Sequence, residues 1–377
     1  MSRPGPQPLS VPVLAGWAWC ALAATVWWAC GGPLPFLLAP MATFALAQAL
    51  GWPLREWRHG RACGQCLLGV ALGLRFTEEV FEGLWSRWPV ILLAALLALM
   101  PAWLVYQAYR RWARQTPLTA CLCALPGGAS EMAMLADRHG ANTAAVAWTQ
   151  ALRVTLVVSV VPWCLMGAGT LTKADGGSAL MPFMGTQRMG WAHWMPWVMW
   201  ALWTGLVCLP THWLHRRQWP NVWLMGPLLA TVVLMAAGPQ TIGLMTLPPG
   251  ALEFAQLCLG MTLAARLDRR TWKEAPRLTM VAIGVVLGSL VLCGALAVCL
   301  AWGGPQVPRA WLTHGLSMAP GGMAEMALLA RQSGAWLPEV IATHVLRLAL
   351  VLCLAPWLVR WVRRHATPPS EGAEPGA

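Results

Sequence analysis

Charged side chains are scarce in this sequence. They make up 11% of the 377 residues, whereas hydrophobic residues make up 58%. A soluble domain carries about 25% charged residues. The apolar residues run in stretches of roughly 17–25, the length that crosses about 30 Å of hydrocarbon as a helix. This composition excludes an ordinary soluble domain and predicts an all-α polytopic membrane protein.

The sequence also lacks a segment that could fold into a DNA-reading domain. The net charge is +12, but the basic residues lie in short clusters between apolar runs, such as 55–61, 110–114 and 360–364. Such clusters mark cytoplasmic loops of membrane proteins, whereas nucleic-acid binding needs a basic patch on a folded domain. We expect no direct contact with nucleic acid, a multi-pass protein of the bacterial inner membrane, and cytoplasmic termini. The apolar run Val11–Cys30 is expected to be a first span and not a cleaved signal.

Groupings of metal ligands are missing as well. The eight histidines are scattered along the chain. Cys63 and Cys66 form a CxxC pair, but no second pair stands nearby to complete four ligands. Most other cysteines lie in apolar runs and are expected to act as small buried hydrophobes. We expect no metal site, no cofactor and no enzymatic activity.

The clearest pattern in the sequence is an internal duplication. The segment Pro126–Ala133 recurs 194 residues later as Pro320–Ala327, and about half of the window that follows is identical. The same spacing relates Gly140 to Gly334, Gln150 to His344, Arg153 to Arg347 and Pro162 to Pro356. A weaker match relates 65–75 to 256–266. We predict two homologous membrane repeats, 1–185 and 186–366, followed by a disordered tail, 367–377.

The positions of the basic clusters predict that the two repeats have inverted topology. If these clusters face the cytoplasm, the equivalent spans 61–76 and 252–266 run in opposite directions, and so do the equivalent spans 33–51 and 222–237. This count assumes that each Pro-Gly-Gly segment enters the membrane and returns on the same side. If both segments cross fully, the halves are parallel, and that alternative stays open.

Each Pro-Gly-Gly segment is expected to break or re-enter as a helix. Proline lacks an amide proton, and paired glycines free the backbone to leave helical geometry. Broken helices at matching positions of two repeats indicate a transporter's binding site. Glu131 and Glu325 follow in the first turn of the resumed helix, where the helix dipole favours a carboxylate. At membrane depth such a group marks an ion or proton pathway, although a simple capping role is the alternative.

Further polar residues follow in the next apolar helix of each repeat. Arg153 and Arg347 lie 22 residues after their glutamates, which are their expected partners. Gln150 and His344 lie three residues before the arginines, on the same helix face, and are expected to line a shared cavity. Arg75 and Arg266 end their spans and are expected to reach the membrane interface. The candidate binding residues are Pro126, Gly127, Gly128, Ser130, Glu131, Gln150, Arg153, Pro320, Gly321, Gly322, Glu325, His344 and Arg347.

These same segments resemble the AbrB-duplication family of bacterial inner-membrane proteins. The resemblance rests on Pro126–Ala133, on its twin and on the Gln150…Arg153 element, and it covers roughly residues 15–365. Members are labelled AbrB family transcriptional regulators or ammonia monooxygenases, so the resemblance implies a multi-pass membrane protein linked by name to gene regulation. Gln150 has His344 as its twin and Ser130 has Ala324, which puts a symmetric role of these residues in doubt.

Two functions remain open on the sequence alone. The first is a secondary transporter of a small solute, coupled to protons or sodium through Glu131 and Glu325. The alternative is a membrane-embedded sensor or regulator that influences gene expression indirectly. The partners would be the lipid bilayer and a small solute or ion, and a homo-oligomer is possible. Two glutamates and two arginines cancel in charge, so an anion, a cation and a zwitterion are all open.

Overall fold

The protein is helical throughout the part of the chain that the structure describes. In this computed structural model the described residues are 11–52, 57–76, 78–170, 221–237, 250–266, 274–303 and 309–365, with Leu247 and parts of 205–219. The predicted repeat boundary near 185 and the predicted tail 367–377 lie outside them. The helices are α1 (Val11–Ala29), α2 (Pro35–Ala49), α3 (Gly60–Gly73), α4 (Glu78–Ser86), α5 (Trp88–Leu97), α6 (Pro101–Arg111), α7 (Pro117–Ala124), α8 (Ala129–His139), α9 (Thr143–Gly167), α12 (Val222–Ala237), α13 (Ala251–Ala264), α15 (Pro276–Gly303), α16 (Ala310–Met318), α17 (Met323–Ser333) and α18 (Leu337–His365).

Four helical stretches within the described residues are long and apolar enough to cross a membrane. They are Trp88–Arg111 (α5 with α6), Thr143–Gly167, Pro276–Trp302 and Leu337–Arg364. The outer face of α15 is apolar, because Met280 is 72% exposed and Val291 is 74% exposed. A soluble protein rarely exposes a continuous apolar face of this kind. The all-α membrane-type fold predicted from composition is therefore confirmed.

Three expected spans are shorter than a full crossing. The predicted spans 33–51, 222–237 and 252–266 fold as α2, α12 and α13, which have 15, 16 and 14 residues. A straight crossing needs about 20 residues. Pro40 and Pro227 stand inside α2 and α12 at equivalent positions. The two matching helices therefore share both their reduced length and their internal proline.

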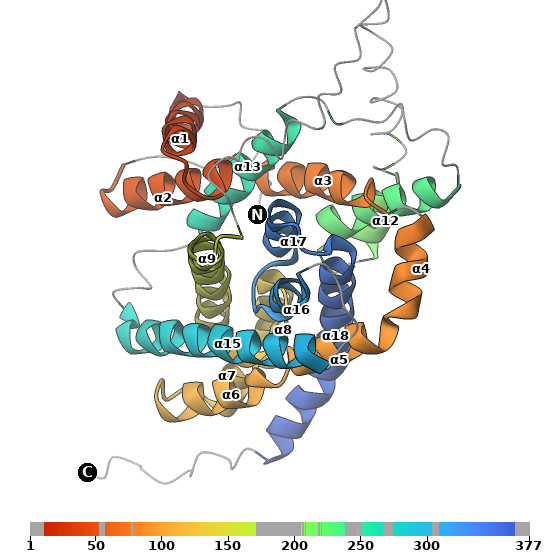
Figure 1. The fold of residues 1–377 in the computed structure, drawn as a ribbon. Helices are drawn as coiled ribbons and strands as arrows, with labels where there is room; N and C mark the ends of the chain where they lie inside the picture. Colours follow the sequence, from red (N-terminus) through yellow and green to blue (C-terminus); the bar gives the residue numbers. More distant parts are fainter. Residues whose placement is uncertain are drawn as a thin grey trace, which may run out of the picture.

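The duplication is visible in the order of the helices. The sequence α7, α8, α9 recurs as α16, α17, α18, with a non-helical Pro-Gly-Gly segment between the first two members of each set. Gly140 and Gly334 end α8 and α17 in the left-handed region, with φ of 71° and 69°. Only glycine adopts this conformation without strain. In Figure 1, α16 and α17 stand in the middle, with α3, α12 and α13 on one side and α5, α6 and α15 on the other.

Equivalent glycines hold the two halves together at equivalent contacts. A Cβ atom on Gly69 of α3 would lie 2.6 Å from the Leu224 carbonyl oxygen of α12. A Cβ atom on Gly260 of α13 would meet the Leu37 carbonyl oxygen of α2 in the same way. Each contact joins a helix of one half to a helix of the other. The absence of a side chain lets the backbones approach this closely.

The equivalent helices α3 and α13 run in opposite directions where they pack together. Gly60, at the start of α3, lies beside Thr262 near the end of α13. One turn further along α3, Gly64 lies beside Cys258, and its missing Cβ atom would be 2.8 Å from the Ala255 carbonyl oxygen. Gly64 and Ala255 are themselves equivalent residues of the two halves. The two equivalent helices therefore pack in opposite directions and meet at equivalent residues.

We predict that Gly69→Ala lowers the free energy of unfolding by about 1–3 kcal/mol, because the added methyl group must displace backbone. The matched control is Gly288→Ala in α15, where a Cβ atom would have nothing within 4 Å. The control is expected to be neutral or to stabilise by up to about 1 kcal/mol. Equilibrium unfolding in mixed detergent micelles measures both. Equal effects of the two substitutions would contradict the close helix contact.

Candidate functional site

Both predicted helix breaks are present. The helix α7 ends at Ala124, and α8 begins at Ala129, with Leu125 and Gly128 in extended conformation (ψ of 128° and 142°). The second break has Ala319 and Gly322 at the equivalent positions, with ψ of 137° and 145°. A helix that stops leaves its last carbonyl oxygens without backbone partners. In an apolar environment each such group costs on the order of several kcal/mol unless it finds a donor.

The two arginines supply donors to these carbonyl oxygens. Arg153 Nη1 donates to Leu125 O at 3.3 Å, and Nη2 donates to Gly127 O at 3.0 Å. Arg347 donates in the same way to Ala319 O at 2.8 Å and to Gly321 O at 3.3 Å. Each guanidinium therefore bridges the end of a broken helix, where the dipole is negative.

The predicted pairing of each arginine with the glutamate of its repeat is wrong. Among the described residues, neither Arg153 nor Arg347 forms an ion pair with Glu131 or Glu325. The reason is the backbone geometry of the break. The break presents two carbonyl oxygens at a spacing that a guanidinium can bridge. These oxygens accept the guanidinium hydrogen bonds that a carboxylate would otherwise accept.

Gln150 and His344 also serve the breaks. Gln150 is 1% exposed, and its Nε2 donates to Leu122 O and Leu125 O, both at 3.0 Å. His344 Nε2 lies 3.0 Å from Leu316 O, which is the equivalent of Leu122. His344 Nδ1 lies 2.9 Å from Arg347 Nη2. Since a carbonyl oxygen can only accept and a guanidinium can only donate, His344 carries its proton on Nε2 and is neutral.

The two glutamates occupy the opposite ends of the breaks, in the first turns of α8 and α17 as predicted. Each carboxylate folds back over the glycine that precedes its helix, so that a Cβ atom on Gly128 or Gly322 would collide with it. Glu131 Oε1 also accepts a hydrogen bond from the backbone N–H of Asn221 at 3.2 Å. This is the position of a capping-box glutamate, which satisfies the free amides of a helix start.

A cavity of about 120 Å³ brings the two breaks together. Its volume admits several water molecules or a small solute. The polar and charged side chains around it are Arg61, Gln65, Glu131, Arg153, Asn221, Thr262, Arg266, Glu325, His344 and Arg347. Gly127, Gly128, Gly321 and Gly322 also line it. Residues of both Pro-Gly-Gly segments therefore line one cavity.

Two of the described candidate residues do not line this cavity. Gln150 and Pro320 are not among its lining residues, contrary to the predicted symmetric pairs. Gln150 is directed instead to the carbonyl oxygens of α7. The side chain of Ser130 lies outside the described part of the structure.

Five polar residues of the cavity were not among the predicted site residues: Arg61, Gln65, Asn221, Thr262 and Arg266. Arg266 was expected at the membrane interface, but it lines the cavity because α13 ends beside the first turn of α3. Arg61 was counted among the loop clusters, yet it lies at the start of α3. Asn221 follows a segment outside the described residues and accepts a hydrogen bond from Gln65 Nε2 at 3.2 Å. The equivalence of Gln65 and Gln256 in the repeat was the one sequence pattern that could have indicated polar residues of α3 and α13 at the site.

A second, smaller cavity of about 30 Å³ lies on the other side of the breaks. Pro126 and Pro320 both line it, together with residues of α6, α7 and α15. Pro126 and Arg153 line both cavities. The first cavity is lined by residues of α3 and α13, and these helices lie across the molecule from α6 and α15 in Figure 1. The Pro-Gly-Gly segments therefore contribute residues to both cavities.

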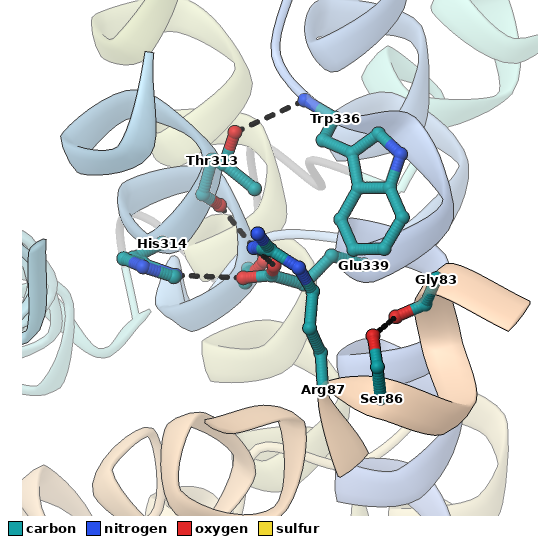
Figure 2. A network of polar contacts seen from close by, with 8 residues as sticks. Gly83, Ser86, Arg87, Thr313, His314, Trp336 and Glu339 are labelled. Carbon is teal, nitrogen blue, oxygen red and sulfur yellow. Dashed lines mark hydrogen bonds and ion pairs between the residues drawn. The ribbon is translucent and has the colours of Figure 1, made fainter. Parts of the chain in front are cut away.

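A separate buried network joins α16, α18 and the start of α5. His314 Nδ1 lies 2.6 Å from Glu339 Oε1, and Arg87 Nη1 lies 3.9 Å from Glu339 Oε2 (Figure 2). Glu339 is fully buried and His314 is 1% exposed. The equivalents of Glu339 and His314 in the first half are Ala145 and Ala120, so the first half has no counterpart of the His314–Glu339 contact. In the described part of the chain, no group of three or more histidine, cysteine or acidic residues could hold a metal ion.

Comparison with known proteins agrees with this architecture. Residues 36–363 match the family described as Transition state regulatory protein AbrB. The chain belongs to this AbrB family. The predicted resemblance is thereby confirmed, and the matched region extends from α2 into α18 and includes every residue that lines the larger cavity.

Two relatives are similar to this AbrB-family protein over most of their lengths. The "Uncharacterized protein YhjN" of Bacillus subtilis (strain 168) is 26% identical over 318 residues, which cover 79% of this chain and 77% of the relative. The "Putative regulator AbrB" of Escherichia coli (strain K12) is 25% identical over 339 residues, which cover 89% of this chain and 91% of the relative. Both alignments are long enough to include the two halves.

Proposed function

We propose that this AbrB-family protein is a secondary transporter of a small solute in the bacterial inner membrane. The observation that carries the proposal is the meeting of two equivalent broken helices, each with a first-turn glutamate, at one charged cavity. Broken helices of this kind form the central binding sites of transporters, where free backbone groups and helix ends contact the solute. The contribution of the same segments to both cavities supports a change of access.

An inverted repeat would provide the two states of access. The antiparallel packing of α3 against α13 supports such an arrangement, because equivalent helices of inverted repeats point in opposite directions. In one state the larger cavity is open on the side of α3 and α13. Exchange of the conformations of the two halves would enlarge the smaller cavity and close the larger one.

The coupling ion is proposed to act on Glu131 and Glu325. Both carboxylates lie at helix starts and beside the cavity, so each can exchange a proton or contact a sodium ion there. Both termini are proposed to lie in the cytoplasm, in agreement with the positions of the basic clusters.

A second candidate function is a membrane-embedded sensor that influences gene expression. The name of the Escherichia coli relative, a regulator, favours it. A sensor needs to bind a solute but does not need to move it. Binding without flux is therefore the observation that separates the two functions.

We predict that Glu131→Gln and Glu325→Gln each reduce coupled uptake into proteoliposomes by about tenfold or more, since removal of a coupling carboxylate removes the driving reaction. The matched control is Glu82→Gln on α4, where the side chain is exposed and does not line the cavity. Uptake of radiolabelled butyrate, glycine and methylammonium with an inward proton or sodium gradient is measured. If no probe enters, or if both variants transport as the wild type does, the transporter proposal is wrong.

A further inference from the structure

The charges around the larger cavity do not cancel. Four arginines and two glutamates line it, which leaves a formal excess of two positive charges even when both glutamates are ionised. The sequence had identified two of these arginines, and the fold adds Arg61 and Arg266. A cavity with this balance attracts an anion and repels a cation.

The four arginines fall into two pairs at different places around the cavity. Arg153 and Arg347 are held by the carbonyl oxygens of the broken helices. Arg61 and Arg266 come from α3 and from the end of α13, outside the breaks. Both act electrostatically on the carboxylate of Glu325, so their charges reach the place where that carboxylate lies.

The starts of α8 and α17 both face the cavity, since Gly128 and Gly322 line it. A helix start binds anions through its free amides and its positive dipole. Here each start is already covered by a carboxylate of the chain itself, Glu131 or Glu325. Each glutamate carboxylate therefore occupies the position in which a helix start would bind the carboxylate of a ligand.

We propose that the cavity binds a small organic carboxylate. In its absence, the carboxylates of Glu131 and Glu325 occupy the anion positions at the two helix starts. The organic class follows from the rest of the lining, which includes Val154, Leu259, Leu263 and Leu348. These side chains suit a short apolar tail, whereas inorganic phosphate offers only polar atoms.

The exchange requires a proton. When the solute carboxylate reaches a helix start, the glutamate that leaves takes up one proton from solvent, and one negative charge has replaced another. The groups that face the glutamates from neighbouring helices are Arg61, Arg153, Arg266, His344 and Arg347. Each of these groups is already protonated or is held neutral by hydrogen bonds, so the glutamates are the proton acceptors. This inference deepens the proposed transport function, which it needs for movement of the carboxylate across the membrane. Binding of the carboxylate in the cavity does not depend on transport.

The duplication provides a matched control for the binding arginine. Arg266 has Arg75 as its equivalent in the first half. Arg75 is exposed at the end of α3 and does not line the cavity. Arg266 and Arg75 are therefore the same residue type at the same place in the repeat. Only Arg266 lines the cavity.

The test is calorimetric titration of the purified full-length protein with butyrate, butylammonium and inorganic phosphate. Butyrate and butylammonium share an apolar tail and differ in the sign of charge. We expect butyrate to bind with proton uptake, which is measured as the dependence of the binding heat on the buffer. Arg61→Gln and Arg266→Gln should each weaken butyrate binding by about tenfold or more, because a charged partner is lost. Arg75→Gln should leave the affinity unchanged.

Each other outcome has a definite meaning. Preference for butylammonium or phosphate, absence of butyrate binding at millimolar concentration, or equal effects of Arg266→Gln and Arg75→Gln would overturn the inference. Thermal unfolding of each variant separates lost binding from lost folding. If butyrate binds with proton uptake but does not cross proteoliposomes, the inference holds and the transport function fails. If a cation is transported in a glutamate-dependent way, the transport function holds and the inference fails.

Discussion

Replacement of Arg347 by methionine is expected to lower the free energy of unfolding by about 3 kcal/mol, because it removes the donors of buried carbonyl oxygens. Arg347 is 4% exposed and donates to Ala319 O and Gly321 O, and it also contacts His344. Methionine has a similar length and no donor, so both oxygens at the break would lose their partner. Equilibrium unfolding in mixed detergent micelles measures the loss.

Two further variants make this test specific to the helix break. Arg347→Lys keeps the charge, but an ammonium group cannot bridge two carbonyl oxygens as a planar fork does, so only part of the stability should return. Arg360→Met is the control on the same helix, since Arg360 is exposed and donates to Pro356 O one turn earlier. It should change stability by no more than about 0.5 kcal/mol. Equal stability of all three variants would show that the arginine does not hold the break.

The second large effect is expected at Glu339. Glu339→Ala should lower the free energy of unfolding by about 3–5 kcal/mol, because it leaves His314 and Arg87 without their buried acidic partner. The carboxylate joins helices of both halves, at 2.6 Å from His314 and 3.9 Å from Arg87 (Figure 2). The Arg87 guanidinium also lies 5.2 Å from the Trp336 ring centroid, which gives it a second attachment.

A double-mutant cycle separates the pair from general damage. If the contact between His314 and Glu339 accounts for the loss, the double variant His314→Ala/Glu339→Ala should lose clearly less than the sum of the single variants. Glu82→Ala, at an exposed position of α4, serves as the control and should be nearly neutral. Additive losses of the two single variants would show that the contact contributes no coupling energy.

The helix breaks were predictable because their causes are local. Proline removes an amide proton, and two glycines remove the restriction on the backbone, so Pro126–Gly128 must leave helical geometry whatever surrounds it. The place of Glu131 and Glu325 follows from counting three residues past the glycines. The repeat itself made the prediction stronger, because the same local pattern occurs twice.

The partners of the charged residues were not predictable in the same way. Arg153 has a glutamate 22 residues before it in the chain, but its donors are bound by Leu125 O and Gly127 O. Backbone oxygens carry no signature in the sequence, and their availability depends on where the helix stops. The prediction that each arginine pairs with a glutamate by charge was therefore wrong about the acceptor, although it placed the arginine on the correct helix.

The sequence by itself determined the membrane-type composition, the duplication, both helix breaks and the glutamates at the resumed helices. Only the tertiary structure decided that Arg61 and Arg266 join the cavity and that Gln150 does not. It also created the buried contact of His314 with Glu339, whose residues have alanines as their equivalents in the first half. The physical reason is range. Backbone rules act between neighbours, whereas the charge of a cavity is the sum of groups that packing brings together from distant helices.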